Sequence, residues 1–243
     1  MAYQRPKLVN GEYYHVVVRA VGDTIVFDDE DDFYRGIFSI YEFNNNKSVN
    51  MFNRRRNRLI EKKNEAPCEV GLNTKLIIPD KRSRFVDMLA FSFMPNHLHL
   101  ILKQLKDNGI SKFMQKFGTG FANYFNEKYD RIGHLFNKFR AVHIKDDNQF
   151  KNAFVYVHTN LISVIEPGWK EHGIKNPGKI KEFLENNKRH SYMDYLGKKA
   201  FPSVTQRDFL LEAMGGGRGC KAYTDAWIEH KNKLAGFEDI ILE

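Results

Sequence analysis

The sequence predicts an α+β fold, in which an antiparallel sheet is combined with helices rather than alternating with them along a parallel sheet. Three observations support this class. Short β-branched and aromatic runs end at turn residues, longer segments between them carry apolar residues at helical spacing, and the two kinds of segment follow the order β-α-(insert)-β-β-α-β-α. With 243 residues the chain is long enough to bury a sizeable core.

The first predicted elements are a strand and a helix joined by an acidic turn. Tyr13–Arg19 is rich in β-branched and aromatic residues, which favours a strand. The acidic run at residues 28–32 offers helix caps, and the apolar residues after it predict a helix over residues 30–44. Residues 45–85 are polar and basic, so we interpret them as an insert before the next strand.

A hairpin, a long helix, a strand and a second helix come next. The apolar runs 86–93 and 97–102 are split by a Pro-Asn pair, which predicts a tight turn between two strands. Residues 109–129 place their apolar side chains on one helical face. Residues 135–144 favour a strand, and a capped helix is expected over residues 147–164.

The first six elements follow the ferredoxin-like order βαββαβ, so we expect an antiparallel sheet with helices on one face. Residues 1–167 would form this domain. Residues 168–243 are interpreted as a C-terminal helical appendage rather than a second full domain. In the appendage we expect helices near 179–188, 205–214 and 221–234, with Gly215-Gly-Gly-Arg-Gly as a flexible joint between the last two.

Composition favours a polyanionic partner. Lys and Arg number 38 against 30 acidic residues, a net charge of +8, and 20 Phe, 11 Tyr and 2 Trp give a high aromatic share. Most of these rings should be core, but some could stack on the bases of a single-stranded nucleic acid. In the insert, Arg54, Arg55, Arg58 and Lys62 would share one face of a helix. That face is either solvated or in contact with phosphates.

The compartment expected from the sequence is the cytoplasm, with the protein associated with the nucleoid. Apolar stretches are too short to span a bilayer, and the N-terminus has no apolar run that would make a signal peptide. Cys68 and Cys220 stand alone, which argues against a disulfide framework and for a reducing environment.

The strongest local signal is Asn96-His97-Leu98-His99-Leu100. Alternate side chains of a strand share a face, so His97 and His99 project together while the two leucines point to the other side. Two neighbouring imidazoles suit a cation site. The same pattern also occurs on half-exposed strands as polar surface.

A second pair of polar residues lies on the helix predicted from residue 147. Tyr156 and Asn160 are four positions apart and therefore neighbours on one face. His158 points almost the opposite way and is excluded from this group. Taken alone, the pair is compatible with an amphipathic edge and a solvated amide as well as with a site.

Together, the His-hydrophobe-His strand and the downstream Tyr-x-x-x-Asn helix resemble the single-tyrosine HUH transposases, and more closely the REP-associated tyrosine transposases. The resemblance covers roughly residues 11–44 and 86–215. Its motifs are Tyr14-His15-Val16-Val17-Val18-Arg19, Phe93-Met94-Pro95-Asn96-His97-Leu98-His99-Leu100, Gly133-His134-Leu135-Phe136 with Arg140, Tyr156-Val157-His158-Thr159-Asn160, and Ser191-Tyr192-Met193-Asp194-Tyr195-Leu196-Gly197.

The resemblance implies a role for each residue of the site. His97, His99 and Asn160 would bind a divalent cation, and Tyr156 would attack a DNA phosphodiester, leaving a 5′-phosphotyrosine and a free 3′-OH. Arg19 and Arg140 would contact nucleic acid. The implied substrate is single-stranded DNA beside an imperfect hairpin, and the implied outcome is strand transfer. A homodimer and a monomer are both compatible with the family.

The chemistry of the ligands limits the choice of metal ion. Two imidazoles would suit Zn²⁺ or Ni²⁺, whereas the family uses Mg²⁺ or Mn²⁺, which the amide oxygen of Asn160 and phosphate oxygens would fit. Mn²⁺ is the better match to this mixed set. Three alternatives stay open: a non-catalytic module that binds single-stranded nucleic acid, a metal-dependent phosphohydrolase that uses water, and a domesticated nuclease.

Overall fold

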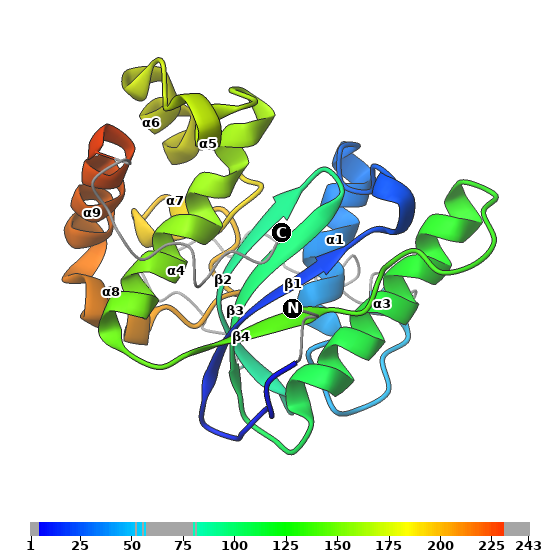
Figure 1. Ribbon diagram of the computed structural model, residues 1–243. Helices are drawn as coiled ribbons and strands as arrows, with labels where there is room; N and C mark the ends of the chain where they lie inside the picture. The colour runs from blue at the N-terminus through cyan, green and yellow to red at the C-terminus, as the bar shows by residue number, and fades with distance from the viewer. Residues whose placement is uncertain (1–4, 52, 55, 57–79, 81, 231–243) are drawn as a thin grey trace, which may run out of the picture.

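Four antiparallel strands form one sheet in the order β2-β3-β1-β4 (Figure 1). The strands are β1 (Tyr13–Arg19), β2 (Val86–Met94), β3 (His97–Gln104) and β4 (Arg140–Ile144). The structure is a computed structural model, and it describes residues 5–51, 53, 54, 56, 80 and 82–230. This strand order, with each neighbour antiparallel, is that of the ferredoxin-like fold, so the predicted α+β class is confirmed.

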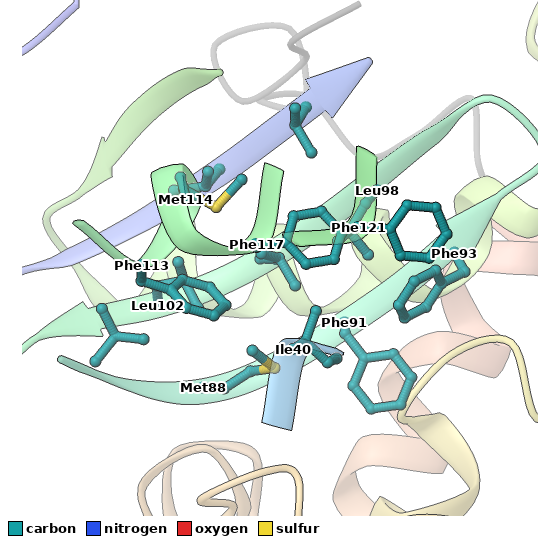
Figure 2. Packing of buried hydrophobic residues seen from close by; sticks show 14 of the residues in the cluster. Ile40, Met88, Phe91, Phe93, Leu98, Leu102, Phe113, Met114, Phe117 and Phe121 are labelled. Atoms are coloured by element: carbon teal, nitrogen blue, oxygen red, sulfur yellow. The ribbon is translucent and has the colours of Figure 1, made fainter. Parts of the chain in front are cut away.

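One face of the sheet is covered by α1 (Glu30–Glu42) and α3 (Gly109–Lys128), as the sequence predicts. The N-cap side chain of Asp29 accepts a hydrogen bond from the backbone N–H of Asp32, which fixes the start of α1. Figure 2 shows aromatic and aliphatic side chains from both helices and two strands packed into one core. Its members include Phe91, Phe93, Leu98, Phe117 and Phe121.

The opposite face of the sheet is covered by α4 (Asp147–Thr159), with the C-terminal helices packed outside it (Figure 1). Ile101 of β3 and Phe154 of α4 belong to this second core. The sequence predicts an amphipathic α4, but residues 153–159 are all buried because the sheet lies on one side and the appendage on the other. From Asn160 to Val164 the helix tightens to 3-10 geometry.

Residues 135–139 are not part of β4, although the sequence favours a strand from residue 135. The chain there meets the end of β1 through an isolated bridge between Ala20 and Phe136. Hydrogen bonds also run from the Val21 N–H to the Leu135 carbonyl and from the Asn137 N–H to the Arg19 carbonyl, both 2.9 Å. A single bridge does not make a ladder, so regular pairing begins at Arg140.

The helices of the C-terminal part are α5 (Trp169–His172), α6 (Pro177–Asn186), α7 (Tyr192–Tyr195), α8 (Asp208–Met214) and α9 (Gly216–His230). In the described part of the chain, no helix has the length and apolar character needed to cross a membrane.

The glycine run after α8 is a tight corner, so its interpretation as a flexible joint is wrong. Gly215 ends α8 with φ 77°, and α9 begins at the next residue. A Cβ on Gly217 would lie 2.7 Å from the Tyr195 carbonyl oxygen, and one on Gly219 would overlap the Met214 carbonyl. Glycine is therefore required by the close approach of backbones.

The appendage also closes the free edge of β2. The Phe93 N–H donates to the Arg189 carbonyl at 2.7 Å, and the Ser191 N–H donates to the Phe91 carbonyl at 3.0 Å. These bonds satisfy backbone groups that an edge strand would otherwise expose. They also bury His190 beside His158 of α4, with ring centroids 5.5 Å apart.

The burial of these two imidazoles predicts acid sensitivity. Burial lowers the pKa of His190 to about 3 and lowers that of His158 well below its usual range. Because an unfolded histidine titrates near pH 6.5, the unfolded state binds more protons below that pH, and stability falls as the pH falls toward 3. Each such group adds about 1.4 kcal/mol per pH unit to the slope.

Between pH 6.5 and 4.5, the unfolding free energy of the wild type should fall with decreasing pH. We expect His190→Leu to make this slope shallower by about 1.4 kcal/mol per pH unit. Urea denaturation at pH 7.0, 5.5 and 4.5 measures this slope for both proteins. Equal slopes in the wild type and the variant would show that His190 does not titrate on unfolding.

Candidate active site

His97 and His99 lie side by side on the face of β3 that α4 covers. Their ring centroids are 4.8 Å apart, and both side chains are almost fully buried. Leu98 and Leu100 point into the opposite core, as the strand alternation predicts. The pairing register places Val17 and Arg19 of β1 directly opposite the two histidines.

His99 is the centre of a buried hydrogen-bond chain. Its Nδ1 lies 3.0 Å from Nε2 of His15, and its Nε2 lies 2.7 Å from the side-chain nitrogen of Asn160. Asn160 is 2% exposed, so it is not a solvated amide. It sits where α4 passes into the 3-10 turn, and this brings the amide down onto β3.

Of the two ring nitrogens of His97, one is hydrogen-bonded within the described structure and the other is not. Its Nδ1 lies 2.7 Å from the Asn96 amide oxygen, while its Nε2 is buried with no hydrogen-bond partner among the described residues. Burial, together with the nearby charges of Arg19 and Lys170, lowers the pKa of His97 to about 3. The imidazole is therefore neutral at neutral pH and able to offer a lone pair.

Tyr156 closes the group from α4. Its ring lies 5.6 Å from the ring of His99 and 5.6 Å from that of His15, in both cases edge to face. The side chain is 3% exposed. Burial raises the pKa of the Tyr156 phenol to about 12, and the charge of Arg19 acts in the opposite direction. His158 points away from this group, as predicted, and its Nε2 lies 2.8 Å from the hydroxyl of Ser191.

Two cations border the site, and the sequence analysis identified only one of them. Arg19 is the last residue of β1, and its guanidinium lies 3.6 Å from the carboxylate of Asp23. Lys170 comes from α5, and its ammonium lies 5.7 Å from the centre of the Tyr156 ring. No sequence pattern marks Lys170, because it reaches the site only through the path of the chain from α4 to α5. His15, also missed, could have been found from its alternation with Val17 and Arg19 on one strand face.

The donors present fit a divalent cation. The described residues contain no group of three or more His, Cys, Asp or Glu side chains placed to hold a metal ion, so a cation held by the two histidines would need further ligands from an amide or from the substrate. Two neutral imidazoles and the Asn160 amide provide nitrogen and oxygen donors together. The buried and unpartnered Nε2 of His97 is the observation that favours a bound ion.

The other residues predicted to bind nucleic acid fall into two groups. Arg54 lies 3.5 Å from the buried carboxylate of Glu42, at the side of α1. Arg55, Arg58 and Lys62 lie outside the described residues, so that part of the prediction stays a prediction. Arg140 opens β4 and pairs with Val17, in the same cross-strand row as His99.

A groove of about 1040 Å³ runs between α3 and residues 133–140. The α3 side carries no charge and is mostly polar, and its lining residues are Ser111, Met114, Gln115, Gly118, Thr119, Ala122, Asn123 and Asn126. The other side is basic, with Arg5, His134, Lys138 and Arg140. None of the described residues that line the groove is acidic.

Residues 46–160 match the family described as Transposase IS200 like. This stretch is therefore similar in sequence to IS200-like transposases. It contains β2, β3, α3, β4 and α4, and therefore His97, His99, Tyr156 and Asn160. The predicted resemblance to transposases is confirmed over this range.

Two solved structures are similar in fold, and no curated protein matches the chain. One is a REP-associated tyrosine transposase bound to a REP hairpin, 12% identical, covering 86% of this chain and 93% of its own, with a TM-score of 0.46. The other is a bacterial tRNA(His) guanylyltransferase (Thg1)-like protein in complex with ATP. It is 12% identical and covers 78% of this chain and 77% of its own, with a TM-score of 0.38. At these scores neither likeness fixes what this chain binds.

Proposed function

We propose that this protein cleaves and rejoins single-stranded DNA through a covalent bond to Tyr156. One observation carries the proposal: within the stretch that matches the IS200-like transposase family, Tyr156 and Asn160, from the end of α4, pack against His99 of β3. A phenol beside paired imidazoles and an amide, bordered by Arg19 and Lys170, suits an anionic phosphodiester.

The covalent step retains the energy of the broken phosphodiester bond in a phosphotyrosine bond. The phenol oxygen of Tyr156 attacks phosphorus, the bond from phosphorus to the 3′-oxygen breaks, and the phenol proton ends on that oxygen. The products are a 5′-phosphotyrosine and a 3′-OH, and reversal of the step on another 3′-OH rejoins DNA without ATP. Burial raises the pKa of the Tyr156 phenol and so disfavours the tyrosinate needed for attack. The positive charge of Arg19 acts in the opposite direction and favours the tyrosinate.

His97, His99 and Asn160 would hold a divalent cation, which when bound supplies charge withdrawal from the scissile phosphate. Mg²⁺ or Mn²⁺ is the proposed ion, and Mn²⁺ fits two imidazoles and an amide better. The residues themselves remain neutral, because burial depresses both histidine pKa values.

We further propose that the groove between α3 and residues 133–140 receives the stem of a DNA hairpin beside the cleavage site. Its volume of about 1040 Å³ exceeds that of most small-molecule pockets, and its charge complements phosphate. Arg140 belongs both to the groove and to the cross-strand row of His99, so a stem held there would present its single-stranded end to the site.

Salt dependence tests the groove. Each phosphate contact on duplex DNA adds about 0.9 to the slope of log affinity against log salt. We therefore expect Lys138→Gln with Arg140→Gln to flatten that slope by up to about 2 for a hairpin ligand. Lys112→Gln, on α3 but outside the groove, should leave the slope unchanged. A slope in the double variant equal to that of the wild type would remove the groove from the DNA interface.

Covalent capture separates the proposed function from its alternatives. The protein is incubated with Mn²⁺ and labelled single strands that carry hairpins, and adducts are resolved on a denaturing gel. Strand transfer predicts labelled protein that resists denaturation. A binding module predicts retention only under native conditions, and a hydrolase that uses water predicts cleaved DNA without labelled protein.

A further inference from the structure

His15 touches both a proposed metal ligand and the proposed nucleophile. It lies in the middle of β1, has no exposed surface, and stacks on His99 with ring centroids 5.2 Å apart and planes at 12°. Its Nε2 is 3.0 Å from Nδ1 of His99, and its ring meets Tyr156 edge to face. A fully buried histidine in this position needs a reason other than packing, since β-branched and aromatic residues fill strand interiors without a polar cost.

The hydrogen bonds around His99 are consistent with one tautomer. A neutral imidazole has one N–H and one lone pair. On the Nε2 side, the Asn160 side-chain nitrogen at 2.7 Å donates, so Nε2 carries the lone pair. The proton is then on Nδ1, which donates to the lone pair of His15 Nε2 at 3.0 Å.

We propose that His15 is a positioning residue that holds His99 in the Nδ1–H tautomer, with the Nε2 lone pair facing Asn160. The inference rests on the proposed function in one respect, because Nε2 is the atom that a cation between His99 and Asn160 requires. A histidine ligand whose other nitrogen is fixed by a hydrogen bond binds metal more tightly, and loss of that partner typically costs about 10- to 100-fold in affinity.

Two substitutions separate positioning from packing. His15→Phe keeps a ring against His99 and Tyr156 but removes the acceptor. His15→Gln gives up the ring and retains an acceptor oxygen. His143→Phe is the matched control: it is the same change on the neighbouring strand, at a position paired with Tyr14 and therefore on the opposite face of the sheet.

The tautomer of His99 can be read without metal or DNA, from the nitrogen chemical shifts of the imidazole in the metal-free protein. We expect an Nδ1–H signal in the wild type and in His143→Phe, a mixed or Nε2–H signal in His15→Phe, and restoration of Nδ1–H in His15→Gln. Calorimetry with Mn²⁺ should show a loss of about 10- to 100-fold in His15→Phe and a smaller loss in His15→Gln.

An unchanged His99 tautomer in His15→Phe would overturn the inference, as would equal Mn²⁺ affinity in a folded His15→Phe protein. If that variant does not fold, an Nε2–H signal in His15→Gln overturns it instead. A wild-type protein that forms no DNA adduct would contradict the proposed function. The tautomer response to His15 would then still stand on its own, so the two failures are distinguishable.

Discussion

Replacing His97 and His99 together by Ala is expected to lower Mn²⁺ affinity by at least about 100-fold and to abolish covalent capture of DNA. The two imidazoles supply the nitrogen donors of the proposed site, and the Asn160 amide alone binds a divalent cation weakly. DNA affinity should change much less, since the basic groove and Arg19 are untouched. Calorimetry with Mn²⁺ and a native gel shift measure the two quantities.

The control for this pair is His143→Ala, which removes a histidine of the same sheet that faces away from the site and bonds Glu12 at 2.9 Å. Circular dichroism must show that the double variant is folded, because both replaced side chains are buried. Unchanged Mn²⁺ affinity in a folded double variant contradicts the assignment of these two residues as ligands.

Tyr156→Phe should reduce adduct formation on the order of 10³-fold or more, while leaving fold and DNA binding intact. Only a hydroxyl is lost, and the ring still packs against His15 and His99. Tyr192→Phe is the matched control, because that phenol is also buried and its pKa is also raised by burial. Quantitative gels over a range of Mn²⁺ concentrations give the rates. An undiminished adduct in Tyr156→Phe would place the nucleophile elsewhere.

Local patterns predicted most of the sheet. The strand Tyr13–Arg19 is found at those bounds, and the Pro-Asn pair does separate β2 from β3. The failures lie where tertiary contacts decide. Residues 135–139 have strand-like composition but form only an isolated bridge, and residues 153–159 of α4 are all buried because the C-terminal helices cover the face that the sequence predicted to be solvated. The glycines after α8 are required by the close approach of the Tyr195 and Met214 carbonyls, and Tyr195 lies about 20 residues away, beyond any local window.

The candidate site shows the same division. The alternation of the histidines and the four-residue spacing of Tyr156 and Asn160 are local facts, and the structure brings all four residues together. The sequence places His15 on the same strand face as Arg19, but that β1 lies beside β3 is a property of the whole sheet, so the contact between His15 and His99 was not predicted. Lys170 could not have been found from its neighbours, since only the path of the appendage takes α5 to Tyr156.

The most direct test of the central claim is to identify the covalent bond. The wild-type protein is incubated with Mn²⁺ and a hairpin-bearing single strand, digested with protease and nuclease, and mapped by mass spectrometry. The account predicts a nucleotide joined through its 5′-phosphate to the peptide that contains Tyr156, and its release when a strand with a free 3′-OH is added before digestion. A nucleotide attached to any other residue, or DNA cleaved with no attached peptide, would contradict it.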